Sequence, residues 1–222
     1  MSLFHSPSLV TSGLVLCLDA GNPKSYPGSG TTWTDLSGNA NTGTLVNGPT
    51  FNSANGGSIV FDGVNDMAEC QPSSLFNFGT GNFSAFVWFR FSQIVTHPTL
   101  FDLDNSASGN NILFYGNTQA DPRFRTWIGG GVRNSTAGFA VNTWYHCGVS
   151  RSSGLVSQYI NGVLDGTFTG SGNVSSGQFL RIGTAHYARF NGLISSVSIY
   201  NRALSAAEIT TNFNAMRGRY GV

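Results

Sequence analysis

The run F-S-A-F-V-W-F-R-F over residues 83–91 constrains the fold more than any other part of this chain. In an extended strand, successive side chains point to opposite faces, so one face here collects five apolar residues: Phe83, Ala85, Val87, Phe89 and Phe91. The other face is also largely apolar and carries Ser84, Phe86, Trp88 and Arg90. A strand that is apolar on both faces needs a cover on each side. This run therefore predicts a central strand of a layered β structure.

Short strand-like runs recur along the chain, separated by clusters of Gly, Asn, Ser and Pro, which is typical of a β-sandwich or barrel. Turn pairs such as Asn161-Gly162 and Asp165-Gly166 supply the positive φ angles of tight hairpins. Residues 20–57 form the longest irregular stretch, and a loop of that length is usually functional or packed as a compact layer. We expect an all-β, two-sheet antiparallel sandwich with strands at 14–18, 58–62, 67–71, 82–91, 99–103, 111–115, 123–128, 143–151, 155–161, 179–183 and 191–200.

The expected strand at 191–200 has a simpler pattern than the central one. Leu193, Val197 and Ile199 alternate with Ser196 and Ser198. We therefore expect one face of this strand to meet solvent or a partner.

One helix is predicted after that strand. Ser205 and Glu208 form a capping box that starts a helix over residues 205–217, and Leu204 can pack onto Ile209. An apolar stripe then follows at helical spacing, which is the pattern of a helix docked on a core: Ile209, Phe213 and Met216.

Composition excludes several classes of protein. With 222 residues the chain fits one large domain, and 13% aromatic residues give it the apolar surface that disordered chains lack. The formal net charge is +1 and no basic run occurs, so we expect no nucleic-acid partner. We also expect no signal peptide, because the N-terminus lacks a basic segment followed by a long apolar one. We expect no membrane insertion, because no apolar stretch approaches the roughly 20 residues that span a bilayer.

The three cysteines are Cys17, Cys70 and Cys147, and each lies in a strand-like run. We expect buried free thiols rather than a disulfide framework or a zinc site, because the count is odd and the spacings match neither. This fits synthesis in a reducing cytoplasm.

Six segments in order carry a family resemblance. They are G-S-I-V-F-D-G-V-N-D (57–66), F-S-A-F-V-W-F-R (83–90), N-T-W-Y-H-C-G-V-S-R (142–151), Q-Y-I-N-G-V-L (158–164), L-R-I-G (180–183) and F-N-G-L-I-S-S-V-S-I-Y-N-R-A-L-S-A-A-E-I (190–209). Together they resemble the laminin-G-like jelly roll of the concanavalin A-like lectin/glucanase superfamily. The resemblance implies a jelly-roll sandwich over residues 13–222, preceded by an N-terminal extension, residues 1–12, that is either an anchor or an ordinary terminus. Ser195-Ser196 stands where many relatives carry acidic residues, so no metal role is transferred to that position.

The flanking segments, residues 6–26 and 212–222, resemble laminin-G-like proteins of tailed bacteriophages. That resemblance implies a virion protein, made in the host cytoplasm, that decorates a capsid or belongs to a fibre or tail. Its partners would be other virion proteins, further copies of itself, and glycans of the host surface. The alternative is a bacterial carbohydrate-binding or adhesion module.

The residues argue against catalysis. The resemblance implies that a glucanase of this superfamily would carry its catalytic carboxylates on one strand, in the pattern Glu-x-Asp-x-Glu. A retaining glycosidase requires two such neighbouring carboxylates. This chain has only Glu69 and Glu208, which are far apart in sequence. Asp102 and Asp104 are the nearest substitute, and we expect them to be solvated or hydrogen-bonded loop carboxylates. The histidines are scattered, and His146 is expected in the core.

Calcium is the one cofactor that the sequence suggests. Asp35, Ser37, Asn39 and Asn41 lie at every second position, so their oxygens could converge on a hard cation. A second candidate set is Asp62, Asn65 and Asp66. The alternative in both places is that these side chains bond to the backbone of their own turns.

Glycans would stack on aromatic side chains at loop tips. Trp33, Trp127 and Tyr187 lie beside expected loops and are the candidates for such stacking. The alternative for each ring is core filling.

Overall fold

The computed structural model describes residues 8–103, 112–116, 118–174, 179–184 and 188–222. These residues form two eight-stranded antiparallel sheets that pack face to face, which confirms the all-β sandwich. Sheet A has the order β14 (Val163–Thr169), β13 (Leu155–Ile160), β12 (Trp144–Ser152), β7 (Phe83–Gln93), β16 (Asn191–Tyr200), β5 (Ser58–Asp62) and β4 (Thr50–Asn52), with β1 (Leu14–Asp19) also paired to β16. Sheet B has the order β11 (Gly131–Gly138), β10 (Arg123–Ile128), β9 (Ile112–Gly116), β8 (Thr99–Leu103), β15 (Leu180–Ile182), β6 (Met67–Cys70), β3 (Gly43–Val46) and β2 (Thr32–Trp33).

The core lies between the two sheets and is dominated by phenylalanine. β7 occupies the middle of sheet A, between β12 and β16, and its odd-numbered side chains point into this core. The Phe89 ring, for example, lies within 6.5 Å, centroid to centroid, of the rings of Phe91, Phe124 and Phe190. The three cysteines are buried and free, as the sequence predicts.

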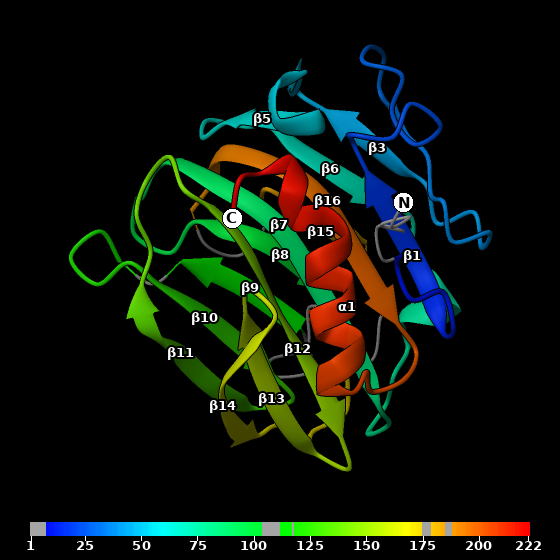
Figure 1. Ribbon diagram of the computed structural model, residues 1–222, viewed down its shortest axis with the longest axis vertical. Helices are drawn as coiled ribbons and strands as arrows, with labels where there is room; N and C mark the ends of the chain where they lie inside the picture. The colour runs from blue at the N-terminus through cyan, green and yellow to red at the C-terminus, as the bar shows by residue number, and fades with distance from the viewer. Residues whose placement is uncertain (1–7, 104–111, 117, 175–178, 185–187) are drawn as a thin grey trace, which may run out of the picture.

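The outer face of sheet A is covered by helix α1 (Ala206–Met216), which crosses the sheet in Figure 1. Both halves of the capping box between Ser205 and Glu208 are present. Trp88, on the outer face of β7, stacks on Phe213 of the helix at 5.5 Å and on Tyr220 of the tail at 4.3 Å. The prediction that this central strand is covered on both faces is therefore confirmed.

β16 does not follow its simple sequence pattern. Ser195 is an extra residue in the pairing with β7, and this bulge turns the strand by one residue. Ile194 and Val197 consequently point into the core, whereas Leu193 points outward to the helix. The expectation that one face meets solvent or a partner holds only in part, because Ser196 on that face is 4% exposed whereas Ser198 is partly exposed.

The long stretch at 20–57 is more regular than expected. It contributes the short strands β2, β3 and β4 to the edges of both sheets, together with the 3-10 turn η1 (Ala54–Gly56). Two further edge strands, β11 and β14, were also not expected. All five are edge or near-edge strands, whose polar residues lack the apolar alternation that marks a buried strand.

The edge strands β11 and β14 of the two sheets lie close together. Asp165 is an extra residue of β14 in its pairing with β13, and its carboxylate lies 3.1 Å from Arg133 of β11. The Arg133 guanidinium also donates to the backbone oxygen of Asp165 at 2.9 Å. The Thr136 N–H of β11 donates to the same carboxylate at 3.0 Å, so Arg133 and Thr136 together join the two sheets along this side.

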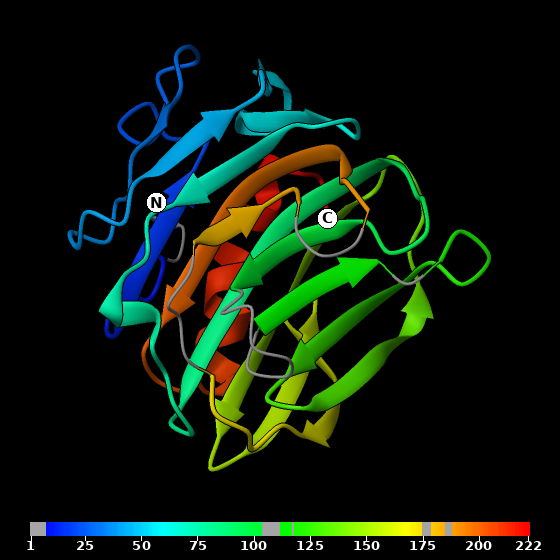
Figure 2. The same ribbon diagram turned by 180° about the vertical axis from the view of Figure 1, so that it is seen from behind.

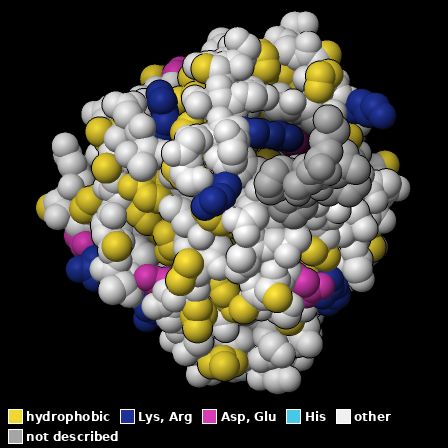
Figure 3. Space-filling view, viewed as in Figure 1, with side chains coloured by type: hydrophobic (Ala, Val, Ile, Leu, Met, Phe, Trp, Pro, Cys, Tyr) yellow, Lys and Arg dark blue, Asp and Glu magenta, His cyan; other side chains and the backbone are white. Residues whose placement is uncertain are grey.

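In Figure 3 the exposed hydrophobic side chains are scattered over the face, and some of them lie near its lower end. Leu155 is 51% exposed at one end of the β13–β14 hairpin, and Val163 and Leu164 are 69% and 52% exposed at the other. Because the ends are separated by the length of the hairpin, these residues do not make one continuous apolar patch. Among the described residues, no helix has the length and apolar character needed to cross a membrane.

Candidate functional site

The outer face of sheet B is the large sheet surface that α1 leaves open. In Figure 2 this face is turned to the viewer and the helix lies behind the sandwich. Side chains that alternate with core residues stand on it. Arg125 and Trp127, for example, alternate with Phe124, Thr126 and Ile128, which are fully buried.

A first hollow on this face, of about 130 Å³, is centred on the half-buried ring of Trp127. Arg125, Gly130 and Val132 complete its lining. Val132 is opposite Trp127 on β11 and 46% exposed. The Arg125 guanidinium lies 5.6 Å from the centroid of the Tyr115 ring, which holds it in place. The hollow combines an aromatic ring with a guanidinium group.

A second hollow, of about 250 Å³, is polar and lies over β6 and β15. Arg181 Nε donates to Glu69 Oε1 at 3.0 Å, and both residues stand on the outer face of the sheet. Arg189 donates to the hydroxyl of Thr184 from the segment that leads into β16. Met67 supplies the apolar part of the lining.

The two hollows belong to one row of cross-strand neighbours. Trp127 is opposite Leu113, Leu113 is opposite Asp102, and Asp102 is opposite Arg181. Three strand spacings of about 4.8 Å therefore separate Trp127 from Arg181, roughly 14 Å in all. Asp102 is fully buried, so the hollows are separate openings and not one groove.

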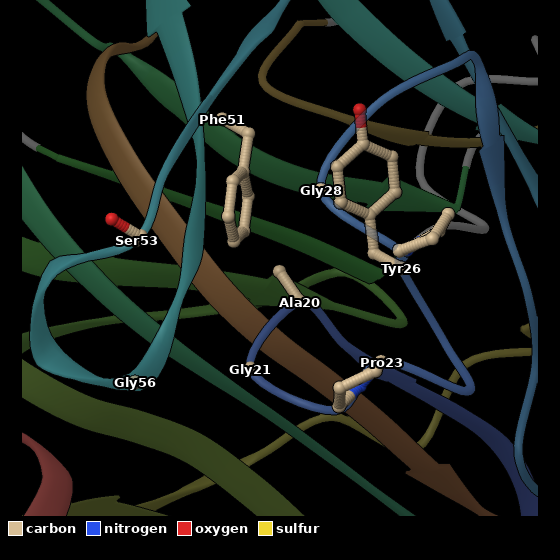
Figure 4. A pocket seen from close by; sticks show the side chains of 9 residues that line it. Ala20, Gly21, Pro23, Tyr26, Gly28, Phe51, Ser53 and Gly56 are labelled. Atoms are coloured by element: carbon tan, nitrogen blue, oxygen red, sulfur yellow. The ribbon is translucent and has the colours of Figure 1, made fainter.

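A third hollow, also of about 250 Å³, lies away from this face, between the 20–28 loop and the β4–β5 hairpin. In Figure 4 the rings of Phe51 and Tyr26 and the side chains of Ala20 and Pro23 surround it, while Ser53 points away. The Tyr26 hydroxyl donates to Gly30 O at 2.8 Å. Since no charged side chain lines this hollow, it offers little hydrogen bonding to a ligand rich in hydroxyls.

The first predicted calcium set is brought together by the structure, but around internal hydrogen bonds. Asp35 Oδ1 accepts from the backbone N–H groups of Cys17 and Ser37 at 2.8 and 2.9 Å. Its Oδ2 accepts from the Ser37 hydroxyl at 2.7 Å and from Asn41 N at 3.0 Å. The amides of Asn39 and Asn41 donate to strand β1, at Leu14 O and Val15 O. A cation would have to displace four donors from one carboxylate, so the arrangement fits a hydrogen-bonded turn.

The second predicted set forms the turn between β5 and β6. Asp62 Oδ1 accepts from Val64 N at 2.7 Å and from Asn65 N at 3.3 Å, and Asp66 Oδ2 accepts from Asp62 N at 3.0 Å. The Val64 N–H lowers the pKa of Asp62, whereas burial raises the pKa of Asp66. Within the described residues, no group of three or more His, Cys, Asp or Glu side chains converges as metal ligands do.

The three aromatic residues predicted to stack on glycans have different outcomes. Trp33 is fully buried, so its ring fills the core and cannot stack on a ligand. Trp127 lines the first hollow. Tyr187 lies outside the described residues.

The structure also shows where the carboxylates considered for catalysis lie. Glu69 pairs with Arg181, and Glu208 is bound by Arg202 at 2.6 Å in the helix cap. The pKa of Glu208 falls to about 2, chiefly because Arg202 donates to it. Asp102 is not a loop residue as expected but a fully buried residue of β8, and Asp104 lies outside the described residues. His146 is 4% exposed, as predicted for a core residue.

Sequence reasoning missed Arg125, Arg181 and Arg189. The first two carried a readable signal, because F-R-T-W-I and L-R-I each place a charged residue between core residues and so on an outer face. No such signal exists for Arg189, since it lies in an irregular segment and meets Arg181 only through the fold.

The comparisons with known proteins agree with this architecture. The laminin-G family described as the concanavalin A-like lectin/glucanases superfamily matches residues 62–210, which is more than half of the chain. The chain therefore belongs to that family. No curated protein sequence matches it.

Solved structures share the fold at low identity. Domain 4 of AbnA, an extracellular GH43 arabinanase from Geobacillus stearothermophilus, solved with arabinotriose, is 18% identical with a TM-score of 0.70, over 90% of this chain and 97% of that one. The binding domain of Paraclostridial mosquitocidal protein 1 is 16% identical with a TM-score of 0.71, over 91% and 52%. Trypanosoma rangeli sialidase is 17% identical with a TM-score of 0.67, over 93% and 33%. The chain thus spans about half of that toxin domain and a third of the sialidase. At these identities the likeness shows the fold alone.

Proposed function

We propose that this chain is a non-catalytic glycan-binding module whose binding face is the outer face of sheet B. The observation that carries the proposal is Trp127, a half-buried tryptophan on the face of sheet B that α1 leaves open, set in a hollow beside Arg125. A flat ring stacks on the apolar face of a sugar, and neighbouring donors bind its hydroxyls. The third hollow supports the proposal less, because its lining lacks such donors.

The absence of a catalytic role is part of the proposal. Glu69 and Glu208, the two glutamates of the chain, are each held by an arginine in different parts of the fold. A glycosidase needs two carboxylates about 5–10 Å apart across one cleft. The relatives whose printed descriptions name a binding domain or a bound arabinotriose add support.

We propose further that the module is displayed on the virion of a tailed phage, in contact with other virion proteins and further copies of itself. The support is the resemblance of residues 6–26 and 212–222 to phage laminin-G-like proteins. Many copies on one particle would convert weak glycan contacts into firm attachment. Mass spectrometry of purified virions tests this part, and absence of the chain from the particle would end it.

A glycan array with the purified chain tests the binding function. We expect Trp127→Ala to weaken binding of the best ligand at least about tenfold, which is about 1.4 kcal/mol, while Trp127→Phe retains most of it. Val141→Ala, a truncation at an exposed valine that lines none of the three hollows, serves as the control. Binding that survives Trp127→Ala unchanged, or turnover of the bound glycan, would contradict the proposal.

A further inference from the structure

The polar hollow over β6 and β15 holds two guanidinium groups and one carboxylate. Arg181 is the anchored member of the pair. Its Nε is bonded to Glu69, and in the strand register it lies between Glu69 and the buried Asp102. Its charge is therefore matched within the protein. The Nη groups have no hydrogen-bond partner among the described residues and remain available on the side of the hollow.

Within the described part of the chain, Arg189 lacks the carboxylate contact that several other arginines have. Arg123, Arg133, Arg202 and Arg219 each have an aspartate or glutamate within 3.1 Å. Arg189 bonds to the hydroxyl of Thr184 and has no carboxylate partner among the described residues. Thr184 is 3% exposed, so it is a fixed acceptor that orients the guanidinium toward the hollow. Among the side chains that line the hollow, two guanidinium groups therefore accompany a single carboxylate, that of Glu69.

We infer that this hollow binds the carboxylate of an acidic sugar, such as a uronic or sialic acid, within the glycan that the module recognises. A guanidinium presents parallel N–H donors that match a carboxylate in two-pronged geometry. Arg189, which has no carboxylate partner among the described residues, can receive the carboxylate of the ligand, and Met67 offers an apolar contact to the sugar ring. Because its volume is about 250 Å³, the hollow suits a single sugar residue rather than a drug-sized ligand. The inference rests on the proposed function.

The test compares matched glycan pairs that differ only in the carboxylate. Immobilised oligogalacturonate and sialyllactose are each measured against their carboxyl methyl esters, by biolayer interferometry with the full chain. We expect the free acid of at least one pair to bind about tenfold more tightly than its ester, and added salt to reduce the difference. The two pairs distinguish a uronic acid from a sialic acid.

Variants assign the preference to the hollow. Arg189→Gln keeps hydrogen-bonding atoms but removes the charge, and we expect it to abolish the preference for the acid. Arg189→Lys keeps the charge without the two-pronged geometry, so part of the preference should return. Arg123→Gln removes an equal charge at an exposed arginine of β10 outside both hollows, and it should leave the preference intact.

Acid and ester that bind equally, a preference that survives Arg189→Gln, or no binding to either pair would each overturn the inference. The proposed function is read separately. If the array contains neutral glycans whose binding depends on Trp127, the module binds glycans but not through a carboxylate. If the array shows no binding at all, the proposed function itself fails.

Discussion

The hydroxyl of Tyr220 donates a hydrogen bond of 2.8 Å to Ser195, which joins the C-terminal tail to the bulge of β16. Ser195 in turn donates to Gly57 O at 2.7 Å, so three segments distant in sequence meet at one hydroxyl. Tyr220 is 5% exposed and its ring packs on Trp88 and Trp144. The tail is therefore part of the cover on sheet A.

Tyr220→Phe should lower the free energy of unfolding by about 1 kcal/mol, because the ring remains and one hydrogen bond is lost. Tyr220→Ala should cost about 3–5 kcal/mol, since the aromatic cluster loses a member. Urea unfolding followed by tryptophan fluorescence measures both. In a double-mutant cycle, Ser195→Ala and Tyr220→Phe should be coupled by about 1 kcal/mol, and strict additivity would show that the bond contributes nothing.

His146 predicts a loss of stability in acid. It stacks between the rings of Phe86 and Trp88 at 5.2 and 4.9 Å, and burial lowers its pKa from 6.5 to about 3. A depressed folded pKa means that the unfolded chain binds the proton more tightly. The stability linked to neutral His146 is complete above pH 6.5 and is lost as pH falls from there toward 3, by at most about 1.4 kcal/mol per pH unit.

His146→Phe keeps a ring in the stack and removes the titrating group. Its unfolding free energy should therefore fall less steeply between pH 6 and 4 than that of the wild type, as roughly 1.4 kcal/mol per unit is removed. Leu155→Ala, at an exposed position, should keep the wild-type slope. An unchanged slope in the His146 variant would show that another group dominates the acid limb.

We expect a substitution of Arg151 to lower the stability of the protein substantially even when the positive charge is kept. It is fully buried, lies over the Phe83 ring at 4.7 Å, and donates to four backbone oxygens: Gly79, Gly81, Gly170 and Gly172. Arg151→Lys keeps the charge but cannot reach four acceptors in a plane. We expect a loss of at least about 2 kcal/mol, which in a chain of this size lowers Tm by roughly 4–8 °C. Arg123→Lys, at an exposed ion pair, should change Tm by no more than about 2 °C.

A substitution at Asp35 can distinguish a hydrogen-bonded turn from a calcium site. Asp35→Asn places an amide among four donors and should cost about 2 kcal/mol or more, as bonds to a charged acceptor are lost. If the carboxylate serves the turn, the loss is the same with calcium and with a chelator. A loss that appears only in calcium, together with a wild-type Tm that calcium raises, would assign the carboxylate to a metal. Asp121→Asn, at an exposed carboxylate, provides the matched substitution.

The sequence predicted the parts of this fold that depend on local pattern. The double-faced β7 and the capping box at Ser205 are specified by residues close together in the chain, and both are present. The phase of β16 was not predictable, because the bulge at Ser195 depends on bonds to Gly57 and Tyr220. The edge strands were missed since pairing, not burial, defines them.

The candidate site was predictable only in part. Trp127 was identified as a ligand candidate from its place beside a loop, and it lines a hollow of sheet B. Trp33 looked equivalent in sequence, but it is buried in the fold, where β2 pairs with β3 within the 20–57 stretch. Arg189 meets Arg181 across a segment of irregular chain, and no local pattern encodes that meeting.

The arginine that fastens β11 to β14 has a consequence for how the protein behaves in concentrated solution. Each of these strands ends its sheet, and an unguarded terminal strand is a template for fibrous aggregation. The bulge at Asp165 breaks the repeat of free backbone groups along β14, and Arg133 occupies the backbone oxygen at that point. We therefore expect copies at high concentration to resist strand-to-strand addition along this edge.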